Sequence, residues 1–150
     1  MTTGRIAMTT FVAFLVQQIL AIAIHGFILA PDYAPYYGSL LRSMDSASWQ
    51  MLLLPVSHLS FIGALVWVYT RARLEGSPAA QGVKLGFVGW LMGQVPLWLL
   101  WYAEQPWPGA LVLKQLALEL VSSVLVGLTV ALVARQRAST SVPVVADLRP

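Results

Sequence analysis

The sequence contains no cysteine, and only 10% of its 150 residues carry a charge. Without cysteine the chain cannot form disulfides, thiolate metal sites or cysteine nucleophiles, and its redox compartment stays undetermined. Soluble domains carry about 25% charged residues, so this chain has too few to cover a surface that faces water. Its basic groups form no run suited to nucleic-acid phosphates, so we expect no nucleic-acid partner. A polytopic membrane protein is the class that fits this composition.

Catalytic signatures are missing as well. The sequence has no HExxH, CxxC, Walker or dinucleotide-binding glycine motif, and no Ser-His-Asp order. The predicted loops are short and leave little room for a soluble active site. We therefore expect neither catalytic residues nor a metal site, and no enzymatic activity.

Hydrophobic residues make up 58% of the chain and gather in four long segments. A helix needs about 20 apolar residues to cross the hydrocarbon core of a bilayer. The predicted spans are residues 6–30, 51–70, 82–103 and 109–134. The first span is longer than the apolar region of a signal peptide, about 7–15 residues, and it contains Gln17 and Gln18, so we interpret it as a retained helix. The sequence thus predicts an all-α, four-helix transmembrane domain over residues 1–137 and a tail over 138–150.

The basic residues fall mainly on one side of the predicted spans, and such a side faces the cytoplasm. Seven of them share this side: Arg5, Arg71, Arg73, Lys84, Arg135, Arg137 and Arg149. The opposite side has Arg42 in the first outer loop and Lys114 near the start of the fourth span. In that loop, Asp45 or Ser46 is predicted to cap the second span. Both termini are therefore predicted to be cytoplasmic, with the chain in an inner membrane.

The third span has one helical face without side chains. Four glycines at i, i+4, i+7 and i+11 form this glycine stripe: Gly82, Gly86, Gly89 and Gly93. Small residues let two helix backbones approach closely in a membrane. Packing within the chain is the default interpretation, and association with another chain is the alternative. Beyond the stripe, Gln94 is polar, and Pro96 removes a backbone hydrogen bond and is predicted to kink the helix.

The two histidines lie at similar depths on the first and second spans. At 1.5 Å per helical residue, His25 and His58 are about 7 Å and about 10 Å from the outer boundary. Neutral imidazoles are axial ligands of haem iron and of the magnesium of chlorophyll-type pigments. The pair therefore suggests a tetrapyrrole site for haem b or a chlorophyll-type pigment, with Phe27, Phe61 and Trp98 as an aromatic wall. The alternative is that each histidine forms a hydrogen bond with a neighbouring helix.

Glu119, near the middle of the fourth span, is the costliest residue of the chain. A carboxylate near the centre of a bilayer costs several kcal/mol unless it is paired, so it should face the interior. The same helical face is polar at i−4, i+3 and i+4, which are Gln115, Ser122 and Ser123. Three roles stay open: a protonated, hydrogen-bonded acid, a pair with His25 or His58, or an intramembrane site that carries protons or ions and includes Gln94.

A resemblance adds to this interpretation. The stretch GVKLGFVGWLMG, an aromatic-rich helix end, and then AEQPWPGALVLKQLALELVSSVLVGLTVALV resemble a group of small four-helix bacterial membrane proteins, known as a domain of unknown function. The resemblance covers the last third to half of the chain. It implies a four-helix fold and no catalytic activity.

The leading functional interpretation is a small accessory subunit that packs against other membrane chains, or against itself, within the lipid bilayer. It depends on the glycine stripe, the tryptophan-rich third span, the short loops and a tail predicted to be held by a partner. Two alternatives remain: a tetrapyrrole-binding subunit that uses His25 and His58, and a small proton-coupled or solute carrier that uses Glu119.

Overall fold

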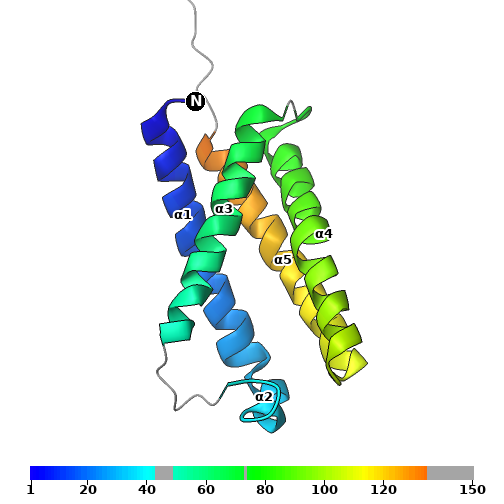
Figure 1. Cartoon of the computed structure of the whole chain (residues 1–150). Coiled ribbons are helices and arrows are strands. Elements are labelled where there is room, and N and C mark those ends of the chain that lie inside the picture. Colours follow the sequence, from blue (N-terminus) through cyan, green and yellow to red (C-terminus); the bar gives the residue numbers. More distant parts are fainter. Residues whose placement is uncertain (43–48, 73, 135–150) are drawn as a thin grey trace, which may run out of the picture.

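The computed structural model describes residues 1–42, 49–72 and 74–134, and its long elements are all helices (Figure 1). Four helical segments are long and apolar enough to cross a membrane: Thr3–Ile28, Trp49–Arg71, Pro78–Glu104 and Gly109–Ala134. The predicted all-α fold with four membrane-spanning helices is therefore confirmed, and the chain is a multi-pass membrane protein.

The first membrane segment changes its helix type part-way. α1 (Thr3–Ala21) continues into a π-helix, η1 (Ile22–Ile28), after which the amide of Leu29 donates to the carbonyl of Ile24 at 2.8 Å. This bond joins residues five apart, which is the π-helical pattern. Such turns are rare in proteins, but many of those known lie at functional sites. They also change the direction of the side chains that follow.

Four further elements come next along the chain: α2 (Ala30–Tyr33), η2 (Ala34–Tyr36), η3 (Trp49–Leu52) and α3 (Leu53–Arg71). The predicted cap of the second span, Asp45 or Ser46, lies outside the described residues. Short helical turns thus connect the first two membrane segments where the structure describes this connection, so α2 lies at one end of the bundle (Figure 1).

α4 (Pro78–Glu104) and α5 (Gly109–Ala134) form a tightly packed pair. The side chain of Ser77 caps α4 by accepting a hydrogen bond from the amide of Ala80 at 3.2 Å. α4 continues through Pro96 as one uninterrupted helix. α5 also packs against α1 and α3, so it is the central helix of the bundle (Figure 1).

The interior is layered along α5. We call the end that carries α2 the α2 end, and the opposite end, which carries the N-terminus, the terminal end (Figure 1). The apolar cluster at the α2 end consists of Ile24, Leu29, Tyr33, Trp98, Trp107, Leu111 and Val112. The cluster toward the terminal end consists of Ala13, Ile62, Leu65, Val66, Leu85, Val126 and Val130. Between the two, α5 buries a polar layer of Gln115, Glu119, Ser122 and Ser123.

The first half of the glycine stripe allows α4 and α5 to touch backbone to backbone. A Cβ added at Gly86 would lie 2.6 Å from the Cα of Val124, and one at Gly82 would lie 2.6 Å from the Cα of Leu128. α5 contributes a glycine that the stripe did not reveal, since a Cβ at Gly127 would lie 2.6 Å from the amide nitrogen of Gly86. No side chain fits at these positions without moving a helix.

The second half of the stripe meets α3 instead. A Cβ added at Gly89 would lie 2.9 Å from Cδ2 of Leu65, and one at Gly93 would lie 3.1 Å from Cε2 of Phe61. These neighbours are side-chain atoms that are able to shift. All four positions of the stripe are thus in contact with helices of the same chain.

Candidate intramembrane acid–base site

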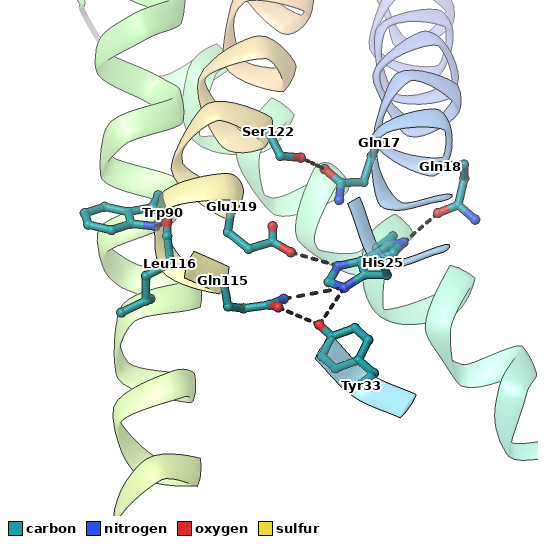
Figure 2. Close-up of polar contacts among 10 residues, drawn as sticks. Gln17, Gln18, His25, Tyr33, Trp90, Gln115, Leu116, Glu119 and Ser122 are labelled. Carbon is teal, nitrogen blue, oxygen red and sulfur yellow. Dashed lines mark hydrogen bonds and ion pairs between the residues drawn. The ribbon is translucent and has the colours of Figure 1, made fainter. Parts of the chain in front are cut away.

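The polar layer is centred on Glu119 and His25 (Figure 2). Oε1 of Glu119, on α5, lies 3.0 Å from Nε2 of His25, which η1 carries. The Glu119 side chain is 9% exposed, whereas the imidazole is 37% exposed. The pair therefore joins a buried carboxylate to an accessible ring, and pairing with a histidine is the role that the geometry gives to Glu119.

Tyr33 of α2 and Gln115 of α5 complete the cluster around the imidazole (Figure 2). Nδ1 of His25 lies 3.0 Å from the Tyr33 hydroxyl, which donates a short hydrogen bond to Oε1 of Gln115. The Tyr33 and His25 rings are nearly parallel, with 11° between their planes and 6.1 Å between their centroids. Both ring nitrogens of His25 thus have protein partners.

The contacts around the imidazole fit one placement of its hydrogens. A phenol has one hydrogen, and Tyr33 donates it to Gln115, so the Tyr33 oxygen accepts a hydrogen bond from Nδ1 of His25 at 3.0 Å. Nε2 of Gln115, which is also a donor, lies farther from Nδ1, at 3.5 Å. The contact between Nε2 of His25 and the Glu119 carboxyl needs one hydrogen, either on nitrogen or on oxygen.

The Tyr33 phenol is a bridge in this cluster and not a base. Burial raises its pKa well above the ordinary value, and the nearby Glu119 carboxylate acts in the same direction. A raised pKa in the folded state keeps the phenol protonated and able to donate. The stabilisation that goes with it is complete below the pKa of the unfolded chain, and it is lost as the pH rises toward the folded value.

We predict that Tyr33→Phe leaves the tyrosinate absorbance of the folded protein unchanged at about pH 11, one unit above the ordinary tyrosine pKa. In denaturant at the same pH, the variant should show one tyrosinate fewer than the wild type, which has five tyrosines. Absorbance titration of both proteins, folded and denatured, checks this. An equal loss of absorbance in the two states would mean that Tyr33 ionises freely in the fold.

α1 and α3 add two polar contacts beside the pair. The Ser122 hydroxyl donates to Oε1 of Gln17 at 3.4 Å, which extends the polar layer toward the terminal end (Figure 2). Nδ1 of His58 lies 2.6 Å from Oε1 of Gln18, and the ring donates because an amide oxygen only accepts. The two histidines are therefore bonded to different partners, and each connects two helical segments.

The tetrapyrrole site stays a prediction, and the structure gives its two histidines different surroundings. His58 has a partner on Nδ1 and keeps Nε2 free, as an axial ligand does, whereas His25 has partners on both ring nitrogens. The expected aromatic wall is also dispersed: Phe27 is exposed, Phe61 packs against the glycine stripe, and Trp98 lies in the cluster at the α2 end.

One other predicted member of the site lies elsewhere. Among the side-chain hydrogen bonds between described residues, none involves Gln94, and the polar contact from α4 comes instead from Trp90, whose Nε1 donates to the carbonyl of Leu116 at 2.9 Å (Figure 2). Lys114 lies closer to the α2 end and forms an ion pair with Asp32 of α2. The site is thus built from η1, α2 and α5.

Tyr33 is the member that the sequence did not reveal. A tyrosine-rich stretch after the first span is typical of a membrane interface, so the sequence places Tyr33 among the interfacial side chains. Pro31, in the first turn of α2, was the available signal, because proline there favours a new helical turn. Such a turn brings Tyr33 back over η1, where it meets His25.

Comparisons with protein-family models, with curated proteins and with solved structures found no match. The resemblance to small four-helix bacterial membrane proteins therefore stays a prediction. The functional argument depends on the geometry of the polar layer.

Proposed function

We propose that this protein is a small proton-coupled carrier of a bacterial inner membrane and that the Glu119–His25 pair is its proton-binding site. The observation that carries the proposal is the 3.0 Å contact between a buried carboxylate and a partly exposed imidazole within the membrane segments. Ionisable groups at such depth are costly and typically mark proton or ion pathways. A carboxyl group and an imidazole in contact are able to exchange a proton, which a coupling site requires.

The two ends of the bundle favour a carrier over a channel. Toward the α2 end, the apolar cluster that includes Tyr33 and Trp98 covers the polar layer. Toward the terminal end, the described polar layer stops near Ser122, and the fully buried Val126 and Val130 follow. A polar site with an apolar cluster on each side fits a protein that opens to one side at a time.

The proposed orientation places the terminal end in the cytoplasm. All basic residues except Arg42 and Lys114 fall on that side of the four membrane segments, as the positive-inside rule requires of a cytoplasmic side. The α2 end then faces outward, and the pair takes its proton from the outside of the cell.

Fusion reporters test this orientation. A fluorescent protein fused after Pro150 should be bright, and alkaline phosphatase fused there should be inactive, because it needs disulfides that form outside the cytoplasm. Phosphatase fused after Arg42 should be active. The reverse pattern at the two positions would place the α2 end in the cytoplasm.

Transport in proteoliposomes tests the function. An inward proton gradient should drive currents in electrometry with a panel of neutral and zwitterionic solutes, whose transport together with a proton moves net charge, and Glu119→Gln should abolish these currents. Glu104→Gln is the matched control, since it removes the same charge from an exposed position at the end of α4. Unchanged currents in Glu119→Gln, or none in the wild type with any solute, would contradict the proposal.

The accessory-subunit interpretation stays a prediction. Its main support, the glycine stripe, is in contact with α3 and α5 of the same chain. The tail over 138–150, which was predicted to be held by a partner, lies outside the described residues. No observation on the described helices therefore favours this interpretation over a carrier.

A further inference from the structure

α2 is attached to α5 at two consecutive positions on each helix. Tyr33 donates to Gln115, and the residues just before them, Asp32 and Lys114, form an ion pair. The first contact is buried, whereas the Asp32 and Lys114 side chains are 38% and 45% exposed. α2 therefore has an inner link that belongs to the acid–base cluster and an outer link that belongs to the surface.

Both links, together with the burial of Tyr33 in the apolar cluster at the α2 end, hold α2 in place. A helix of four residues has no stability of its own, because isolated helices shorter than about 12–15 residues are marginal in water. Its inner link lies between the surface ion pair and the buried Glu119 carboxyl. On the side of the α2 end, the Tyr33 side chain thus lies between the ion pair and the buried Glu119 carboxyl (Figure 2).

We propose that α2 is a gate over the buried Glu119 carboxyl of the pair and that the Asp32–Lys114 ion pair is its latch. When the latch breaks, α2 moves away from α5 with Tyr33, and the carboxyl opens to water at the α2 end. An exposed ion pair shifts an equilibrium by at most about five-fold, and salt weakens it. A latch of this strength holds the gate closed most of the time and still lets it open. The inference rests on the proposed function in that the gated site is the proposed proton site.

The absence of cysteine makes the gate measurable with a single introduced thiol. Ser122→Cys places it in the buried polar layer beside Glu119, where a small membrane-impermeant methanethiosulfonate added at the α2 end should react slowly. Adding Asp32→Asn or Lys114→Gln should speed the reaction by about two- to five-fold. High salt should speed it with the ion pair intact and have no further effect without it.

Two controls separate gating from loosening of the fold. Ser123→Cys is equally buried but adjoins α4 at Gly86, so its rate should not respond to Asp32→Asn. The charge reversal Asp32→Lys with Lys114→Asp restores an ion pair and should restore the slow rate at Ser122→Cys. Equal rates with and without the latch, or an equal rise at both cysteine positions, would overturn the gate.

The gate and the carrier fail independently in these experiments. Labelling needs no transport, so a faster reaction in Asp32→Asn supports the gate even if no solute is carried. The opposite result is also possible: the pH-driven currents disappear in Glu119→Gln, but the labelling rates do not depend on the ion pair. This result would support the carrier and contradict the gate.

Discussion

Glu119→Gln should remove the acid of the Glu119–His25 pair and keep the contact between the two side chains. The amide at position 119 donates N–H to Nε2, while Nδ1 still donates to Tyr33, so every hydrogen bond of the cluster is kept. What disappears is the carboxyl group. We therefore expect the fold to survive, with a change in unfolding free energy of no more than about 1 kcal/mol.

Nitrogen NMR of histidine-labelled protein measures this effect directly. The chain has two histidines, so each ring can be followed separately once His58→Gln identifies its signal. Because Nε2 of His25 faces the Glu119 carboxyl at 3.0 Å, its signal should shift when Glu119→Gln replaces that group by an amide. The signals of His58, which contacts Gln18, should keep their wild-type positions.

Two further variants serve as comparisons. Glu104→Gln should leave the His25 signals unchanged, because Glu104 is exposed at the C-terminal end of α4 and forms none of the described contacts of the cluster. Glu119→Leu should destabilise the protein by about 1–3 kcal/mol, since it leaves Nε2 of His25 without a partner. An Nε2 signal of His25 that does not change in Glu119→Gln would show that the two groups are not in contact.

Gly86→Ala should disrupt the packing of α4 on α5 more than any change on the exposed helix faces. The added Cβ would lie 2.6 Å from the Cα of Val124, and the obstacle is backbone that cannot rotate away. Overpacking of this kind costs about 1–3 kcal/mol, and a clash with backbone belongs at the upper end of that range. Thermal unfolding in detergent should show the loss as a lower midpoint.

The other glycines provide a graded control series. At Gly93 the added Cβ meets the Phe61 ring, a side chain that can shift, so Gly93→Ala should cost less than Gly86→Ala. At Gly63 of α3 nothing lies within 4 Å, and Gly63→Ala should stabilise the helix by about 0.4–1 kcal/mol. Equal midpoints for the three variants would mean that α4 and α5 do not pack as closely as the structure shows.

The fold could be predicted from the sequence because a membrane-spanning helix is recognised by its length and its apolar composition. Four long apolar segments need no tertiary information to be recognised, and the burial of Glu119 follows from the cost of a charge in a bilayer. The polar positions one turn away on the same helix then predict which face of α5 is turned inward, and the structure buries that face.

The partners inside the bundle do not follow from the sequence. Depth alone places His25 and His58 at a similar level, so it cannot decide which of them meets Glu119. Which histidine meets Glu119 depends on the π-helix, because it changes the direction in which the side chains of the first span point where His25 lies. No residue pattern in the span indicates this π-helix. The division of the glycine stripe is equally hidden, since it depends on where α3 crosses α4 and on Gly127 of α5.

The contact between His25 and Glu119 is the centre of this account, and solid-state NMR in lipid bilayers tests it most directly. With nitrogen-labelled histidine and carbon-labelled glutamate, the account predicts a dipolar contact between Nε2 of His25 and the Glu119 carboxyl carbon, as expected for the 3.0 Å separation of Nε2 and Oε1. The contact should be lost in His25→Gln and kept in His58→Gln. A Glu119 contact with His58 in place of His25, or no contact with either ring, would contradict the account.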